Sequence, residues 1–194
     1  AAESKSLTDL KLPDAEVYDQ LYAVQMPLLK HDREAAMVAS LVMATRFPNH
    51  RLTKFAAVAL ARYDAHPVRL LDALDALLAD FPHEPTMVLS RTAVLRELNR
   101  MAERLDVLAT EGSKLNADPM LMQSLAQMLL PLPRRQDEAV RLLRRSLRAR
   151  PMSAAAFYLL GTKLWEDCEF VDAAELYRFA CCLDDREEQF ADAY

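Results

Sequence analysis

The chain has 194 residues, of which 52% are hydrophobic and 27% charged, so it has too much apolar and too little Pro, Gly and Ser content for a disordered chain. It contains only 2 glycines and is rich in Ala, Leu, Arg and Glu, a composition typical of a nearly all-helical protein rather than a sheet protein. The net charge of −5 disfavours nucleic acid as a partner, and the absence of a long uncharged apolar run predicts no membrane insertion.

Residues 1–17 are interpreted as an N-terminal segment that leads into the first helix. The first five residues, Ala1 to Lys5, contain neither an initiator Met nor an apolar signal region. This start is typical of a processed or truncated N-terminus. The expected location is the cytoplasm, with the periplasm as the alternative.

A period of 34 residues runs through the rest of the chain. It is marked by Phe47, Phe81, Leu115, Ala149 and Leu183. A fixed period of this length predicts a stacked array of one supersecondary unit. The period divides the chain into five repeats, residues 18–51, 52–85, 86–119, 120–153 and 154–187, and leaves 188–194 as the start of a further or capping helix.

Prolines and glycines mark special positions in the first four repeats. Pro27 lies inside the first predicted helix, where it costs about 3 kcal/mol and should kink or break the helix. Pro67, Pro85 and Pro119 lie near predicted helix starts, where a missing N–H is harmless. Gly112 costs about 1 kcal/mol relative to Ala unless it permits close packing.

The fifth repeat has the clearest pattern. Its apolar and small residues are Phe157, Leu160, Gly161 and Leu164, then Phe170, Ala173, Tyr177, Ala180 and Leu183. The spacing of three and four predicts two antiparallel amphipathic helices, separated by a turn at 166–169. Gly161, Ala173 and Ala180 would allow the two helices to approach closely.

These residues resemble the tetratricopeptide repeat, which has a Leu-Gly pair in its first helix and an Ala, aromatic, Ala series in its second. The match is nearly complete in the fifth repeat and fair in the fourth. In the first three repeats only the phase is kept, and Arg62, Asp75 and Arg96 stand where the family has apolar or aromatic residues. The resemblance implies an all-α, right-handed superhelical solenoid of about five antiparallel helix pairs plus a terminal helix stub.

The resemblance also implies where a partner would bind. In this family the first helix of each pair lines a concave groove, and its second, fifth, ninth and twelfth positions contact the ligand. These positions here are largely apolar, and they include Thr53, Ala56, Val94 and Leu121. The predicted anchors for a partner segment are Tyr22, Met26, Tyr63, Met87, Met128, Tyr158 and Trp165. The alternative for any one of them is burial in the core.

Charge is segregated between the last two repeats. Residues 134–150 hold seven arginines against two acids, whereas residues 154–194 hold ten acids against three bases. Four of the arginines, Arg141, Arg144, Arg145 and Arg148, share one face of the second helix of the fourth repeat, on the expected convex side. This face is either solvated and partly neutralised by the acidic repeat, or a patch that docks an acidic protein.

No pattern indicates catalysis, a metal or a cofactor. The three cysteines lack metal-ligand spacing and are expected to be free thiols on buried helix faces, and the four histidines to be solvated loop residues. There is no Gly-rich phosphate loop or paired His and carboxylate at catalytic spacing. The sequence therefore predicts no enzymatic activity in this chain.

The resulting prediction is a protein–protein interaction scaffold that binds a segment of a protein or peptide partner in the concave groove. The groove positions lack the Lys and Asn residues with which the family clamps acidic C-terminal peptides, so that ligand is not expected. Two alternatives remain at this stage. One is a regulatory or substrate-docking repeat domain of a larger enzyme, such as a glycosyltransferase or peptidase. The other is a self-associating structural module, held by the basic fourth and acidic fifth repeats.

Overall fold

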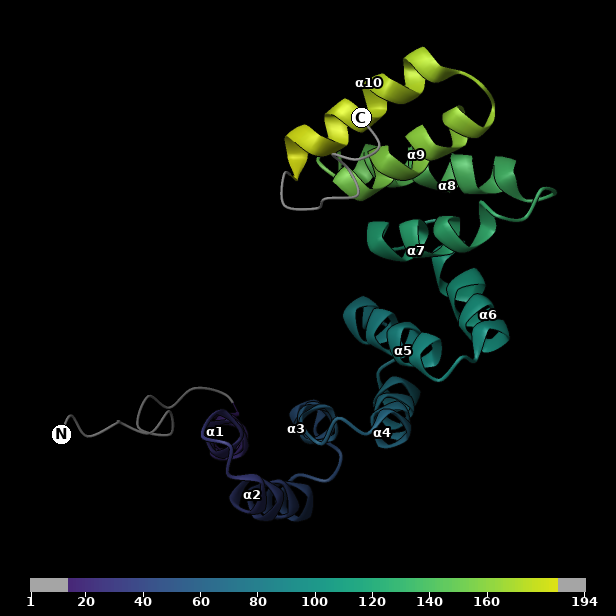
Figure 1. Cartoon of the computed structure of the whole chain (residues 1–194). Coiled ribbons are helices and arrows are strands. Elements are labelled where there is room, and N and C mark those ends of the chain that lie inside the picture. Colours follow the sequence, from purple (N-terminus) through teal and green to yellow (C-terminus); the bar gives the residue numbers. More distant parts are fainter. Residues whose placement is uncertain (1–13, 185–194) are drawn as a thin grey trace. The chain divides into compact units, whose positions relative to one another are not determined.

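The computed structural model describes residues 14–184, and these residues form ten α-helices and no strand. The all-α prediction is confirmed. The helices are α1 (Ala15–Leu29), α2 (Arg33–Arg46), α3 (Arg51–Tyr63), α4 (Pro67–Asp80), α5 (Pro85–Glu97), α6 (Met101–Gly112), α7 (Pro119–Leu129), α8 (Gln136–Ala149), α9 (Ala154–Glu166) and α10 (Phe170–Leu183) (Figure 1). The stub predicted at 188–194 lies outside the described residues.

The period of the sequence recurs in the helix boundaries. The second helices of the five repeats begin at residues 33, 67, 101, 136 and 170, which are 34 or 35 apart. Phe47 and Phe81 cap the C-termini of α2 and α4, while Ala149 and Leu183 are the last residues of α8 and α10. The recurring apolar residue therefore marks the point where the second helix ends in four of the five repeats; the exception is Leu115, since α6 ends at Gly112.

The chain forms two compact halves that divide between Asn99 and Arg100, within the third predicted repeat. In the N-terminal half, α1 packs on α2 and α3, α3 packs on α4, and α4 packs on α5. In the C-terminal half, α6 packs on α7, α7 on α8, and α9 on α10, with further contacts from α9 to α7 and α8. Consecutive helices thus bury one another's apolar faces within each half.

Helices α9 and α10 approach closely at Gly161. A Cβ atom at this position would lie 2.9 Å from two ring carbons of Tyr177 and 3.3 Å from the carbonyl oxygen of Ala173. Tyr177 is buried, and its ring also packs on Tyr158 at a centroid distance of 5.6 Å. The prediction that the small residues Gly161 and Ala173 allow α9 and α10 to approach closely is confirmed.

Gly112 has a similar role at the end of α6. A Cβ atom there would lie 3.1 Å from the carbonyl oxygen of Leu121 and 3.2 Å from Cδ2 of Leu125, both on α7. Gly112 is buried, so its low helix propensity is offset by close packing of α6 on α7.

Prolines begin three of the helices, as predicted, since Pro67, Pro85 and Pro119 occupy the first turn of α4, α5 and α7. The expected break at Pro27 is wrong, because α1 continues through it to Leu29. Pro27 lies in the last turn, and its carbonyl oxygen accepts hydrogen bonds from the N–H groups of Lys30 and Asp32 at 3.0 and 2.8 Å. The proline still forfeits the one hydrogen bond from its own nitrogen to the carbonyl of Ala23, and the helix ends two residues later.

Two histidines have a structural role that the sequence did not predict. His50 and His66 precede α3 and α4, and their Nδ1 atoms accept hydrogen bonds from the N–H groups of Leu52 and Arg69 at 3.1 and 3.5 Å. They act as N-caps, a role that Ser, Thr, Asp and Asn fill more often.

None of the three cysteines is in a disulfide, and their expected burial is wrong. Cys168 and Cys182 are exposed and Cys181 is half-buried. Cys168 lies in the turn between α9 and α10 with a positive φ of 65°. Cys181 and Cys182 are neighbours in α10, and adjacent residues of a helix cannot both face the same core.

Polar contacts replace the repeat signature in the N-terminal half. Asp75 of α4 accepts a hydrogen bond from Nε of Arg91 on α5 at 2.5 Å. Arg62 of α3 donates to the hydroxyl of Ser90 on α5 at 3.1 Å. Two of the residues that depart from the family pattern therefore hold neighbouring helices together.

An ion cluster joins α2, α3 and α4. The guanidinium of Arg33 donates to both carboxylate oxygens of Asp64 at 2.6 and 2.9 Å, and Arg69 lies 3.7 Å from the same carboxylate. The hydrogen bonds from Arg33 hold the pKa of Asp64 below its ordinary value, and the same contact raises the pKa of Arg33. A bidentate pair of this kind fixes the geometry as well as the charge.

We predict that Gly161→Ala destabilises the protein by about 1 to 3 kcal/mol, although Ala is the better helix former, because its Cβ collides with a ring that is itself packed. Urea unfolding measures the effect. In a Tyr177→Leu background the same change should be far less harmful. Equal losses in both backgrounds would show that the contact with Tyr177 does not set the helix spacing.

We further predict that Asp64→Asn lowers stability at neutral pH, and that the difference from wild type shrinks as the pH falls. The pKa of Asp64 is lower in the folded than in the unfolded chain, so the stabilisation is complete above the ordinary aspartate pKa of about 3.9 and is lost as the pH falls through the folded value. Urea unfolding at a series of pH values checks this. The control is Asp72→Asn, an exposed aspartate of α4, and a similar pH dependence for both variants would contradict the prediction.

Candidate functional site: pockets between the first helices

The first helices of neighbouring repeats lie side by side in both halves. In the N-terminal half α1 contacts α3, and in the C-terminal half α7 contacts α9. Each of these junctions contains a pocket, so the surface on which the sequence placed a partner segment is hollowed in both halves.

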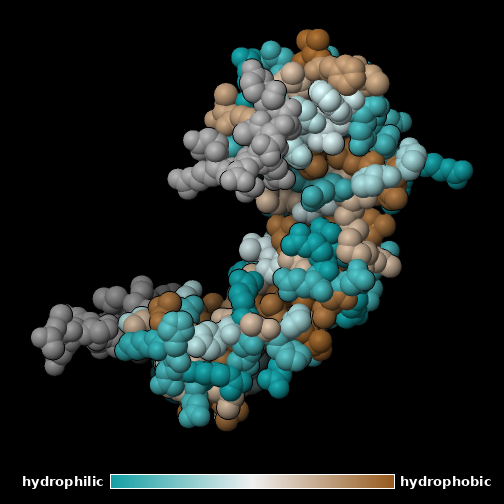
Figure 2. Space-filling view, in the orientation of Figure 1, coloured by the Kyte–Doolittle hydropathy of each residue, from teal (hydrophilic) through white to brown (hydrophobic). Residues whose placement is uncertain are grey.

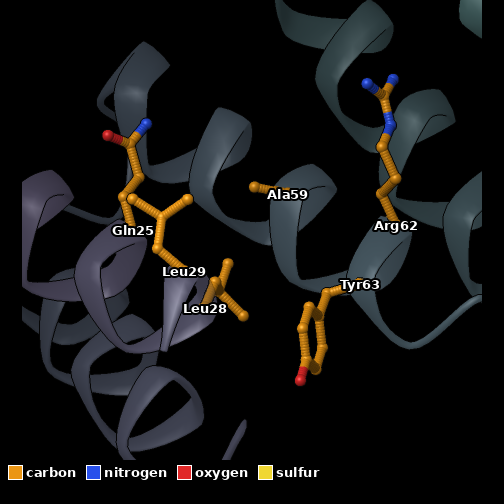
Figure 3. A pocket seen from close by; sticks show the side chains of 6 residues that line it. All are labelled: Gln25, Leu28, Leu29, Ala59, Arg62 and Tyr63. Atoms are coloured by element: carbon orange, nitrogen blue, oxygen red, sulfur yellow. The ribbon is translucent and has the colours of Figure 1, made fainter. Parts of the chain in front are cut away.

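The pocket in the N-terminal half has a volume of about 470 Å³. It is lined by Gln25, Leu28, Leu29, Ala59, Arg62 and Tyr63. Figure 3 shows Leu28, Leu29 and Ala59 at the space between α1 and α3, while Arg62 extends away from the two leucines. The pocket therefore combines an apolar surface with a cation and an amide.

Tyr63 is the predicted anchor that this pocket contains. Its hydroxyl lies 3.4 Å from Nδ1 of His31, and the two rings are tilted at a centroid distance of 6.2 Å. Arg62 uses one N–H for Ser90, and its remaining N–H groups can donate to an acceptor in the pocket. A ligand with an apolar side chain next to a carboxylate or carbonyl group matches this arrangement.

The pocket in the C-terminal half is smaller, about 190 Å³, and more polar. Its lining comprises Met120, Gln123, Ser124 and Gln127 from α7 and Ala155, Tyr158 and Leu159 from α9. Tyr158 is a predicted anchor, whereas the glutamines were not predicted. Amide and hydroxyl groups of this kind can hydrogen-bond the backbone of an extended segment.

A buried polar network fixes the position of this pocket. The amide nitrogen of Gln123 donates to the hydroxyls of Ser146 and Ser153, each at 2.8 Å, and Ser146 donates to the carbonyl oxygen of Pro119 at 3.0 Å. Ser153 also caps α9 by accepting from the N–H of Ala156. The network connects α7, α8 and the start of α9, and it uses both amide protons of Gln123, so this residue can offer its side-chain oxygen to a ligand.

None of the seven predicted anchors is buried. Tyr22 and Trp165 are 54% and 52% exposed, and the other five are half-buried. Tyr63 and Tyr158 line the two pockets, whereas Met26, Met87 and Met128 are not among the lining residues. Trp165 packs edge-on against Phe170 at a centroid distance of 4.8 Å, so it covers the turn between α9 and α10.

Four other positions assigned to the groove belong to the core. Thr53, Ala56, Val94 and Leu121 are buried, and the hydroxyl of Thr53 donates to the carbonyl oxygen of Phe47 at 2.7 Å. Their assignment to the groove is wrong because a repeat length fixes where a helix begins, whereas packing fixes its rotation about its axis. The prediction from apolar positions also missed Arg62, which lines a pocket. A charged residue at a position where the family has an apolar one was the feature of the sequence that could have identified it.

The predicted arginine patch on α8 is not uniform. Arg141, Arg144 and Arg148 are exposed, and among residues 14–184 no carboxylate forms an ion pair with them. Arg145 is half-buried and donates to the backbone carbonyls of Lys114 and Leu115, the latter at 2.8 Å. Arg145 therefore anchors the chain after α6, and three arginines remain available to a partner.

Two other functional features, a metal site and a membrane-spanning helix, are absent from residues 14–184. No group of three His, Cys, Asp or Glu side chains in this part is arranged to hold a metal ion. No helix in it has the length and hydrophobicity needed to cross a membrane. Figure 2 shows apolar residues interspersed with polar ones on the visible face of both halves.

Comparison with known proteins identifies the fold. No family model and no curated protein matches the sequence. PilF of Pseudomonas aeruginosa superposes with a TM-score of 0.70 at 15% identity, covering 91% of this chain and 80% of that one. YrrB, a tetratricopeptide repeat protein with an unusual peptide-binding site, gives 0.65 at 14% identity, covering 100% and 97%.

MamA of Desulfovibrio magneticus RS-1 gives a TM-score of 0.65 at 15% identity, covering 88% of this chain and 96% of that one. These structures are all tetratricopeptide repeat proteins, and this chain has their fold. The resemblance inferred from the fifth repeat is thereby confirmed at the level of the fold.

We predict that Gln123→Leu lowers the free energy of unfolding by about 1 to 3 kcal/mol, because it removes the donor shared by two buried hydroxyls. The measurement is chemical denaturation. Gln127→Leu, on the same helix but exposed, is the matched control and should change stability little. Comparable effects of the two substitutions would show that the buried network does not stabilise this half.

Proposed function

We propose that this chain is a non-catalytic protein-interaction scaffold that holds a segment of a partner protein against the first helices of its repeats. The observation that carries the proposal is the pair of pockets between neighbouring first helices, each lined by a half-buried tyrosine. Tyrosine, tryptophan and methionine side chains that are partly exposed are typical anchors of protein interfaces.

The chemistry of the pockets suggests what the segment contains. The N-terminal pocket suits an aliphatic or aromatic side chain followed by a carboxylate that Arg62 can bind. The C-terminal pocket suits a stretch of backbone whose N–H and C=O groups meet Gln127, Ser124 and the side-chain oxygen of Gln123. Tyr22, Met26, Met87, Met128 and Trp165 are proposed to add contacts outside the pockets. The peptide-binding site named for YrrB gives a precedent on this fold.

Arg141, Arg144 and Arg148 form a second candidate surface for an acidic partner. The exposure of all three and the absence of ion pairs to carboxylates within residues 14–184 favour this assignment. Because these charges are exposed, binding there would weaken steeply with salt, whereas burial of apolar side chains in the pockets would not.

We predict that Tyr63→Ala and Tyr158→Ala each weaken partner binding by about 1 to 3 kcal/mol without unfolding the chain. A pull-down from extract of the native cell, quantified at low and high salt, measures the loss. Leu115→Ala is the control for removal of an apolar side chain, since Leu115 is 87% exposed and lines neither pocket.

The triple variant Arg141→Glu, Arg144→Glu, Arg148→Glu tests the second surface in the same assay. If the pockets bind the partner, this variant should retain it and alter chiefly the association rate. If the tyrosine variants retain all partners and the arginine variant loses them, the partner binds at the arginines of α8 and not at the pockets.

A further inference from the structure

The outward face of α2 is apolar where a surface helix is normally charged. Val38, Leu41 and Val42 are 62%, 70% and 42% exposed, and no charged residue occurs from Ala35 to Thr45. Positions three and four apart share one face of a helix, so these three side chains form one continuous stripe. Such a stripe on a protein surface usually marks an interaction site.

The equivalent positions of other second helices show that a preceding repeat leaves Val38 and Leu41 uncovered, whereas the position of Val42 in α8 holds Arg145, which donates to backbone carbonyls of the preceding repeat. When the helices are aligned on their first residues, Val38 and Leu41 correspond to Asp72 and Asp75 of α4, Arg141 and Arg144 of α8, and Glu175 and Arg178 of α10. All six of these charged residues are exposed, although each belongs to a repeat that follows another. In α6 the same positions hold Asp106, which is exposed, and Ala109, which is half-buried. The positions of Val38 and Leu41 thus face outward in most repeats, and a partner outside the array accounts for apolar residues there.

The charges at the ends of the stripe suggest what that partner is. Glu34 lies one turn before Val38 and Arg46 one turn after Val42, so an acid, two valines and a base follow one another at intervals of four residues. Each step of four residues turns by about 40°, so these side chains form a ridge that winds along the helix, with Leu41 beside it. An antiparallel copy of the same face would place Glu34 opposite Arg46 and Val38 opposite Val42, twice over. This is the self-complementarity that a two-fold interface requires.

Neither end charge is committed to a strong contact within the chain. Glu34 forms no ion pair within residues 14–184. Arg46 has a single ion pair, to Glu16 at 3.4 Å, in which both side chains are more than half exposed, and its guanidinium lies 5.6 Å from the centroid of the adjacent Phe47 ring. Exposed pairs of this kind contribute little, so Arg46 can change partner at little cost.

We propose that the outward face of α2 docks a second copy of this chain through an antiparallel, two-fold α2–α2 contact. Leu41 lies next to the two-fold axis and supplies the central apolar contact, while Glu34 and Arg46 set the register and direction. The contact is separate from the pockets between the first helices, so it leaves them free to bind a partner. A single helix pair buries a small area, and the dimer is therefore weak and concentration-dependent.

Sedimentation velocity of the full chain over a wide concentration range tests the proposal. Wild type should pass from monomer to dimer, and Leu41→Glu should raise the dissociation constant at least about tenfold. Leu115→Glu, which introduces the same change at an exposed leucine outside the face, should leave it unchanged. Circular dichroism checks that each variant keeps its helices.

Charge exchange tests the two-fold geometry. Glu34→Arg alone and Arg46→Glu alone should each weaken the dimer, because every copy then meets like charges. The double variant should dimerise again, and an equimolar mixture of the two single variants should form a heterodimer. Wild type that stays monomeric up to its solubility limit, or dimers unaffected by Leu41→Glu, would overturn the proposal.

The same variants detect other occupants of the face. A monomeric wild type that floats with phosphatidylcholine vesicles, while Leu41→Glu does not, would assign the face to a lipid surface and refute the second copy. Dimers that form but fail the charge-exchange rescue would refute the antiparallel register.

Discussion

No helix pair of this chain can bury its apolar faces by itself. A pair of helices of 11 to 15 residues has too little interior to offset the entropy of ordering the chain, so each pair must be covered by its neighbour. This requirement fixes the length of the repeat, because helices that begin 34 or 35 residues apart present equivalent faces to one another. This packing requirement does not fix which apolar residues occur, provided that the facing surfaces of neighbouring helices are complementary in shape. The period consequently survives in repeats that have lost the family signature.

The two halves meet this requirement with different chemistry. The fifth repeat uses small residues. Gly161 has no Cβ atom, so the ring of Tyr177 can occupy the space next to its backbone. The fourth repeat adds a buried network around Gln123, which binds three helices through hydroxyl groups. The N-terminal half has an apolar cluster of Val17, Val24, Met43 and Ala56 and adds ion pairs between helices, of which the bidentate contact between Arg33 and Asp64 has the most restrictive geometry. Removal of any one of these contacts should destabilise mainly the adjacent helices, as expected for a repeat array.

Positions that face away from the stack are free of the packing requirement, and they differ most between repeats. The same outward positions are apolar on α2, acidic on α4 and basic on α8. The inner positions also differ, from the apolar pocket beside Tyr63 to the amide-lined pocket beside Tyr158. Variation of this kind, on a scaffold whose helices are fixed, is how one fold carries several binding surfaces.

The sequence by itself determined the helix count of the described part, the spacing of 34 residues between equivalent helices, the turn before α10 and the close helix approach at Gly161, because these follow from local periodicity and residue size. Tertiary structure decided the rotation of each helix, which moved Thr53, Ala56, Val94 and Leu121 into the core and left Cys168 and Cys182 exposed. It also decided that Arg62 lines a pocket and that Arg145 anchors backbone carbonyls. A helix can rotate by a fraction of a turn without changing its sequence pattern, and only the side chains of its neighbours select the rotation that fills the space between them.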